Sequence, residues 1–235
     1  MTFLSAEWRN LIMANYAVDP ELLRPHLPKG VELDLFEGVC YASLVGFMFV
    51  NTRMLGVPIP FHTNFEEVNL RYYVRRFVDG AWRRGVVFTK EIVPRTAITL
   101  VARNLYREPY QTMPMRHRWN LTPTQKTIEY QWKYAGKWNR FTVNAKPESL
   151  EMGIGSEPEF ITEHYYGYTR WDDLHTKEYG VKHPRWLVNP VQSYEIDVDF
   201  GALYGEQFAF LGKETPRSVL LAEGSAIEVL TNNTI

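Results

Sequence analysis

Apolar and polar residues alternate over residues 64–74 (NFEEVNLRYYV), the pattern of a β-strand with two unlike faces. The apolar face carries Val68, Leu70, Tyr72 and Val74. The opposite face carries Glu67, Asn69, Arg71 and Tyr73. Alternation of this kind is what any half-exposed strand shows, so by itself it favours solvent for the second face. In a barrel, the same face would instead line a pocket.

Strand patterns recur along most of the chain. Asp79-Gly80 is a dipeptide favoured in tight hairpins, and it separates residues 64–74 from the next strand. Gly136 marks a second hairpin turn. Residues 218–230 indicate one last strand or a pair of strands broken at Gly224. The other expected strands are residues 31–51, with a Glu-Gly turn, and residues 85–93, 127–134, 138–145 and 194–200.

Helix signals are few. Asp19 suits an N-cap, Pro20 suits the first helical position, and Pro25 limits this helix to about two turns. Residues 95–106 have a helical pattern that ends before Pro109. Residues 158–171 predict either a short helix or an edge strand, and residues 52–62 predict a loop.

These elements predict one mainly antiparallel β domain over residues 1–235, because no linker or repeat divides the chain. Closing the sheet into a barrel would remove the exposed edges that so many strands otherwise leave. The 45% hydrophobic content allows a sizeable core, and the 14% aromatic content suits both strands and small-molecule pockets.

Composition excludes several classes of protein. The net charge of -1 leaves no basic stripe for nucleic acid. The longest apolar run, residues 39–50, is too short to span a bilayer, and the N-terminus is not typical of a signal peptide. Cys40 is the only cysteine, which excludes intramolecular disulfides and favours a small buried hydrophobe. We therefore expect a soluble cytoplasmic protein, either monomer or homodimer, that contacts neither nucleic acid nor membrane.

The sequence carries none of the common catalytic or cofactor motifs. Phosphate-binding glycine loops, the GxSxG nucleophile elbow and HExxH are all missing. The six histidines are widely spaced, which favours surface or structural roles over a metal site. We expect no metal and no cofactor.

Several segments together resemble a known bacterial family. They are residues 8–47, 51–60, 65–74, 85–88, 102–110, 160–168 and 182–186, and they include VDPELLRPHLPKGVELD, FEEVNLRYYV and ARNLYREPY. This set resembles the YqjF-like proteins, a family with a domain of unknown function in the acetoacetate decarboxylase-like superfamily. The resemblance covers nearly the whole chain. It implies a closed antiparallel β-barrel of acetoacetate decarboxylase-like type, with a few short helices and a ligand cavity inside.

The resemblance also implies a limit on the chemistry. Decarboxylases of the superfamily use a Schiff-base lysine in a Pro-Lys-Lys run, activated by its lysine neighbour and an apolar cavity. Here Pro109 is followed by Tyr110 and Gln111, neither of which forms an imine. Lys90 is a candidate substitute, because regular alternation places it on one strand face with Phe88; the alternative is a strand-end lysine that reaches water.

With the barrel resemblance, the lumen becomes the favoured surrounding of Glu67, Asn69 and Arg71. Glu67 is the candidate acid/base: pairing with Arg71 or Arg103 would keep it ionised, whereas burial without a partner would raise its pKa. Asn69, Arg71, Arg103 and Tyr110 are candidate substrate-binding residues.

Two further groups remain open. Arg103, Tyr106 and Tyr110 either line a pocket mouth, with Arg103 gripping a carboxylate, or form a surface helix face. His183, between Lys182 and Pro184, is either packed for structure with Trp186 or placed at a cavity entrance.

Three functional hypotheses follow. The first is an enzyme that acts on a small organic acid or carbonyl compound through Glu67 with arginine clamps. The second is a non-catalytic binding or sensor protein that holds an apolar or aromatic ligand in the barrel. The third, a protein-interaction module, predicts a large exposed apolar patch and no cavity. The sequence leaves the choice between catalysis and binding open.

Overall fold

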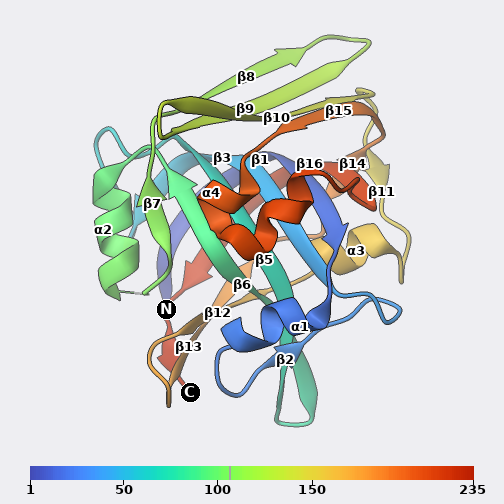
Figure 1. Ribbon diagram of the computed structural model, residues 1–235. Coiled ribbons are helices and arrows are strands. Elements are labelled where there is room, and N and C mark those ends of the chain that lie inside the picture. Colours follow the sequence, from blue (N-terminus) through green and yellow to red (C-terminus); the bar gives the residue numbers. More distant parts are fainter. Residues whose placement is uncertain (106) are drawn as a thin grey trace.

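Seven strands close into a barrel in the computed structural model, which describes residues 1–105 and 107–235 (Figure 1). The closing contact joins the two ends of this row of strands, where Val181 pairs with Val229. In order around the barrel, the strands are β16 (Ser218–Leu230), β1 (Thr2–Ala17), β3 (Tyr41–Met54), β5 (Phe65–Val78), β6 (Ala81–Val93), β12 (Tyr166–Arg170) and β13 (Thr176–Lys182). The expected fold class, a closed mainly antiparallel barrel, is confirmed.

One junction of the barrel is parallel. Tyr166 of β12 lies opposite Gly85 of β6, and the two strands run in the same direction. A side-chain carbon at Gly85 would overlap the backbone of Tyr166 and the ring of Tyr168, so glycine allows this close approach. The hairpin expected at Asp79-Gly80 joins β5 to β6, and both turn residues have positive φ.

A second sheet covers part of the outer face of the barrel and lies across the top of Figure 1. Its strands, in spatial order, are β15 (Val191–Asp197), β10 (Lys137–Ala145), β9 (Lys126–Tyr134) and β8 (Met115–Leu121). Tyr130 and Trp132 of β9 belong to the same buried cluster as Leu70 and Tyr72 of β5. The apolar face of β5 is therefore packed between the two sheets.

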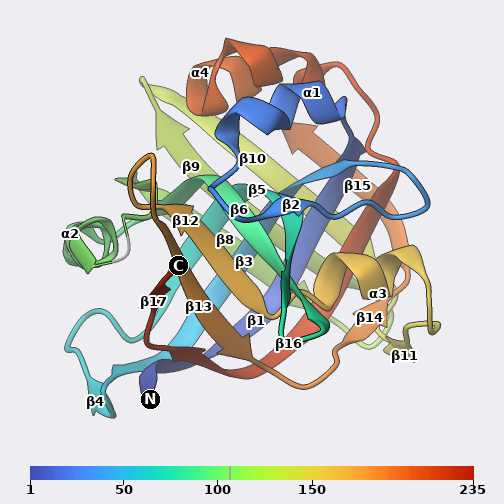
Figure 2. The ribbon, with the colours of Figure 1, turned by 90° about the horizontal axis from the view of Figure 1, so that it is seen from below.

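The helices are short. They are α1 (Pro20–Leu23) with the 3-10 turn η1 (Arg24–His26), α2 (Thr96–Leu105), α3 (Glu157–Thr162), and α4 (Phe200–Tyr204) with the 3-10 turn η2 (Glu206–Gly212). Asp19 caps α1 as expected, because its carboxylate accepts a 2.9 Å hydrogen bond from the Glu21 amide. Figure 2 shows α2 and α3 on opposite sides of the barrel.

Several elements differ from the sequence pattern. The strand expected over residues 194–200 ends at Asp197, because Asp199 caps α4 by accepting a hydrogen bond from the Ala202 amide. Residues 158–171 contain the expected short helix, α3, followed by β12, which is not the edge strand considered because it pairs with both β6 and β13. Gly224, with φ of +78°, does not break β16. β1 was not expected, because a register shift between Arg9 and Ile12 interrupts its alternation.

Short strands complete the sheets. They are β2 (Glu32–Leu33), β4 (Val57–Pro58), β7 (Tyr110–Thr112), β11 (Leu150–Glu151), β14 (Leu187–Asn189) and β17 (Asn233–Thr234). β7 runs parallel to β6 and pairs Tyr110 with Glu91. Cys40 is buried, and burial raises the pKa of its thiol. Within the described residues, we find no helix with the length and hydropathy needed to cross a membrane.

Candidate functional site

The polar face of β5 points into the barrel, where it lines a cavity of about 250 Å³. The exposed fractions of Glu67, Asn69 and Arg71 are 2%, 1% and 9%. Tyr73, next on this face, belongs to the buried cluster inside the barrel. Of the two surroundings considered for the polar face of β5, solvent and the barrel lumen, the face lies in the lumen.

A β-bulge changes which side chains of β6 reach the cavity. Leu70 of β5 pairs with Lys90, whereas the next residue, Arg71, pairs with Phe88. Thr89 is therefore an extra residue in β6 without a partner in this ladder. Alternation along β6 consequently reverses at Thr89.

The bulge brings Glu91 into the cavity and turns Lys90 away from it. Phe88 and Glu91 both line the cavity, although three positions separate them. Lys90 faces the outer core, where its ammonium donates a hydrogen bond to the Leu203 carbonyl oxygen and partial burial lowers its pKa. The expectation that Lys90 shares a face with Phe88 is therefore wrong, because regular alternation does not continue through the bulge.

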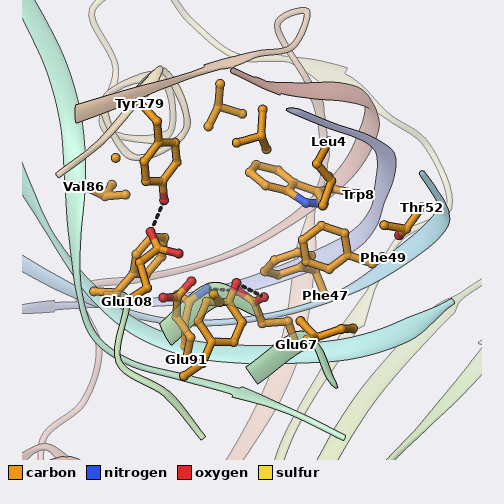
Figure 3. Close-up of a pocket in the computed structure, with 18 of the residues that line it drawn as sticks. Leu4, Trp8, Phe47, Phe49, Thr52, Glu67, Val86, Glu91, Glu108 and Tyr179 are labelled. Carbon is orange, nitrogen blue, oxygen red and sulfur yellow. Dashed lines mark hydrogen bonds between the residues drawn. The ribbon is translucent and has the colours of Figure 1, made fainter. Parts of the chain in front are cut away.

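Glu67 lies at the centre of a hydrogen-bonded group in the cavity wall (Figure 3). The Asn69 amide donates to Glu67 Oε1 over 3.0 Å, and the Tyr110 hydroxyl donates to Glu67 Oε2 over 3.0 Å. Tyr110 is held there because the Glu91 amide donates to the Pro109 carbonyl oxygen over 3.2 Å, next to the β6–β7 pairing. The position after Pro109 thus faces the cavity and carries a phenol.

A second carboxyl–phenol pair lines the same cavity. The Tyr179 hydroxyl of β13 donates a hydrogen bond to Glu108, as Figure 3 shows. The ring of Tyr179 lies over Gly167, its cross-strand partner in β12. A methyl group at Gly167 would overlap the Cζ and hydroxyl atoms of that ring, so the glycine creates the space that Tyr179 occupies.

Burial controls the ionisation of the three glutamates that line the cavity. It raises the pKa of Glu67 to about 7, although hydrogen bonds from Asn69 and Tyr110 and the charge of Arg71 act in the opposite direction. Burial and the nearby Glu67 raise the pKa of Glu108 to about 8. Burial, followed by repulsion from the other two carboxylates, raises the pKa of Glu91 well above its ordinary value. Near neutral pH the group therefore holds protons that it can give or take.

Arg71 supplies a positive charge in the same cavity. Its Nη2 donates to the Ile161 carbonyl oxygen over 3.3 Å and contacts the Met13 sulfur at 3.9 Å, so its bonded acceptors are neutral. Its buried Nε has no hydrogen-bond partner among the described residues. The guanidinium therefore retains donors for an anionic group of a ligand.

His164 lies on the cavity wall with Asp34 behind it. Its Nε2 is 3.2 Å from Asp34 Oδ2, and that carboxylate also accepts a 2.6 Å hydrogen bond from Arg84 Nε. Burial, and to a smaller degree Arg84 and Arg71, lower the pKa of His164 to about 4, although Asp34 acts in the opposite direction. His164 is thus neutral at pH 7 and contributes polarity without charge.

Aromatic side chains form the remaining wall. Trp8 packs edge-on against Phe47 at a centroid distance of 5.3 Å, and Phe49 lies next to both. His183 lines the cavity and stacks on Trp186 at 4.2 Å. His183 thus packs with Trp186, the first of the two alternatives considered, and its ring also lines the cavity.

The helix-end candidates do not all converge with Glu67. Arg103 is exposed on α2, and the residues of α2 that line the cavity are Ala97, Ile98, Val101 and Ala102. Of the two alternatives considered for Arg103, a pocket mouth or a surface helix face, its exposed side chain favours the surface face. Tyr106 lies outside the described residues.

Sequence reasoning missed Glu91, Glu108 and Tyr179. The bulge hid Glu91, and Tyr179 comes from a strand distant in sequence. Glu108 lies two residues before Tyr110, and alternation from this candidate could have identified it.

A model of the family DUF2071, described as an uncharacterised conserved protein, matches residues 5–226. The chain belongs to the DUF2071 family. The uncharacterised protein YqjF of Bacillus subtilis (strain 168) is 28% identical to this chain over 196 residues, which are 82% of this chain and 77% of that protein.

Solved structures similar to this DUF2071 protein share its fold. The enduracididine biosynthesis enzyme MppR with HEPES bound has a TM-score of 0.68 at 14% identity, covering 100% of this chain and 88% of that one. Acetoacetate decarboxylase from Legionella pneumophila has a TM-score of 0.68 at 14% identity, covering 99% and 87%. An acetoacetate decarboxylase-like enzyme from Sphingomonas wittichii RW1 has a TM-score of 0.66 at 12% identity, covering 100% and 94%. At such low identity, the likeness establishes the acetoacetate decarboxylase-like fold.

The donor set of the cavity is rich in carboxylates, but it is not arranged as a metal centre. Across residues 1–105 and 107–235, no three His, Cys, Asp or Glu side chains form a group that could hold a metal ion.

Proposed function

We propose that this protein is an enzyme that transfers a proton to or from a small organic acid or carbonyl compound in the barrel cavity. Glu67 is the acid/base, and Arg71 holds a carboxylate of the substrate. The observation that carries the proposal is the buried Glu67 carboxyl, bonded to Tyr110 and Asn69 at the cavity wall, with its pKa raised by burial to about 7. A general acid/base works best when its pKa lies close to the working pH.

The residues on the wall support proton transfer rather than imine formation. Lysine is not among the described residues that line the cavity, and Lys90 donates to Leu203 outside it. Tyr110 stabilises the ionised form of Glu67 through its hydrogen bond, and Glu108 is a second group with a pKa near neutrality. Arg71 orients the substrate by charge-assisted hydrogen bonds to its carboxylate. The fold neighbour MppR has been solved in complex with pyruvate, a small keto acid.

The test is turnover of a panel of keto acids, other carbonyl compounds and lactones by the wild type and by Glu67→Gln. We expect at least one substrate whose turnover falls about a hundredfold or more in the variant, the usual contribution of a positioned acid or base. Borohydride treatment with each substrate should trap no lysine adduct. Equal turnover by the two proteins would remove Glu67 from the chemistry, and an adduct would replace proton transfer with imine catalysis.

A second candidate is a non-catalytic protein that binds an apolar or aromatic molecule. The aromatic wall formed by Trp8, Phe47 and Phe49 favours it. It predicts a co-purifying ligand in native mass spectrometry, or a thermal shift with a metabolite library, without turnover. Turnover that depends on Glu67 would exclude it.

A further inference from the structure

Glu91 has hydrogen-bonding capacity that the site described above does not use. Its side chain is buried and lines the cavity, and its Oε2 has no hydrogen-bond partner among the described residues. The nearest donors already serve other carboxyls, since Asn69 and Tyr110 donate to Glu67 and Tyr179 donates to Glu108. Among the three carboxyls of the cavity, Glu91 is therefore the one whose buried oxygen is left without a donor.

A buried acceptor without a donor costs free energy, and a ligand that brings N–H groups removes this cost. A cationic N–H group stabilises the site further than a neutral one. It attracts the charged form of Glu91, which Glu67 and Glu108 otherwise repel. An ammonium among the three carboxyls would replace this repulsion by attraction.

Arg71, the positive group of the cavity, and Glu91 lie close enough for one small molecule to contact both. Glu91 pairs with Asn69 across the β5–β6 ladder, and Asn69 lies two residues before Arg71. Two residues of a strand span about 7 Å, and both side chains point to the same face. Arg71 thus offers donors to an anion a short distance from the acceptor that Glu91 offers to a cation.

The rest of the wall suits an apolar body. Trp8, Phe47, Phe49 and Phe88 line the cavity beside the polar groups. The volume of about 250 Å³ lies below the range of roughly 300–1,000 Å³ usual for sites of drug-sized ligands, so the occupant is small.

We propose that the ligand of this cavity is a small amino carboxylate with an apolar side group: its carboxylate binds Arg71 and its ammonium binds Glu91. This inference rests on the proposed function for the carboxylate at Arg71, and it adds the ammonium site. Glu67, Glu108 and the two tyrosines complete the surroundings of the ammonium.

Matched probes separate the two ends of the ligand. One series is L-phenylalanine, 3-phenylpropionate without the amine, and phenethylamine without the carboxylate; the second is L-leucine, 4-methylpentanoate and isopentylamine. Calorimetry with the whole protein at pH 7 should give, in at least one series, the tightest binding for the amino acid. We expect a gain of about tenfold or more over the carboxylate, as for a hydrogen bond to a charged group. N-Acetylation of the amino acid should abolish that gain.

Variants then assign the gain to Glu91. Glu91→Gln keeps the shape of the side chain, and it should reduce the gain to about twofold or less while binding of the plain carboxylate stays within twofold of wild type. Glu195→Gln, the same substitution at an exposed position on the second sheet, should leave both affinities unchanged. Melting of each protein without ligand checks folding, and the wild-type probe series stands even if Glu91→Gln does not fold.

The outcomes distinguish this inference from the proposed function. Equal or weaker binding of both amino acids than of their plain carboxylates overturns the ammonium site alone. Amine binding that needs Glu91, with carboxylate binding that ignores Arg71→Met, supports the ammonium site and overturns the carboxylate clamp. No binding of any probe in either series overturns both.

Discussion

The Tyr110 hydroxyl donates a 3.0 Å hydrogen bond to Glu67 Oε2, and this joins the short strand β7 to the polar face of β5. The bond favours the ionised carboxylate and opposes the rise in pKa caused by burial. The proton affinity of the candidate acid/base thus reflects burial on one side, and the hydrogen bonds from Asn69 and Tyr110 with the charge of Arg71 on the other.

Replacing Tyr110 by Phe should therefore raise the pKa of Glu67 further. A hydrogen bond to a charged group contributes about 1.5–3 kcal/mol, which corresponds to a rise of about one to two pH units. The measurement is an NMR titration of protein labelled at the glutamate carboxyl carbons, with Glu67→Gln used to assign the resonance. An unchanged or lower pKa would show that the bond does not stabilise the carboxylate.

Stability should fall as the pH rises from about 6.5 to about 8.5, because the three cavity glutamates bind protons more tightly in the folded than in the unfolded protein. The slope reaches at most about 1.4 kcal/mol per pH unit for each proton released. His164 has the opposite effect, because its pKa falls from 6.5 to about 4 on folding, and that effect is complete below this window.

Denaturant unfolding at several pH values measures this dependence. The double variant Glu67→Gln/Glu108→Gln should have a flatter profile than the wild type, because two of the titrating groups are gone. A wild-type stability that rises across the window would contradict the raised pKa values.

Gly167→Ala should destabilise the fold by about 1–3 kcal/mol, the usual cost of overpacking. The new methyl group overlaps the Tyr179 ring and displaces its hydroxyl from Glu108. Thermal and denaturant melts measure the loss. Gly153→Ala is the matched control, because a carbon there meets Ser156 at an ordinary distance of 3.7 Å, and it should change stability little. Equal effects of the two substitutions would mean that Tyr179 is not held over Gly167.

Arg71→Met should weaken binding of a carboxylate probe such as 3-phenylpropionate by about tenfold or more, since charge-assisted hydrogen bonds are lost. Arg103→Met is the control and should leave the affinity within twofold, because Arg103 is exposed on α2. Calorimetry measures both. If Arg103→Met had the larger effect, the carboxylate would bind at the mouth of the barrel.

Lys90→Met should lower stability by about 1 kcal/mol through loss of the hydrogen bond to Leu203, and it should leave probe affinity unchanged. Stability and probe affinity should respond differently because the Lys90 ammonium contacts α4, outside the barrel, and does not reach the cavity. A loss of probe binding with unchanged stability would place the ammonium in the cavity.

Local pattern predicted much of the scaffold. The alternation of residues 64–74, the turn at Asp79-Gly80 and the cap at Asp19 are all present, because each depends on neighbours in the chain. The barrel came from the resemblance of many segments together, since no single strand indicates that a sheet closes. α4 was missed because residues 194–200 alternate like a strand until the Asp199 cap.

The site was only half predicted. Glu67, Asn69, Arg71 and Tyr110 converge as expected, because three of them follow one regular strand and the fourth follows Pro109. Glu91 could not be derived from periodicity, because the extra residue Thr89 reverses the alternation. Tyr179 could not be placed either, because its contact is with Glu108, a residue 71 positions away in the sequence.

By itself, the sequence determined that NFEEVNLRYYV is a strand with one apolar and one polar face, because side-chain direction in a strand follows from local backbone geometry. Tertiary structure alone decided that the polar face is buried. The second sheet covers the apolar face from outside, and the closing contact between β13 and β16 encloses the polar face within the barrel. The same closure brings Glu91, Glu108 and Tyr179 beside Glu67, where burial of several carboxyls together raises their pKa values. Proton affinity at this site is thus a property of the assembled barrel.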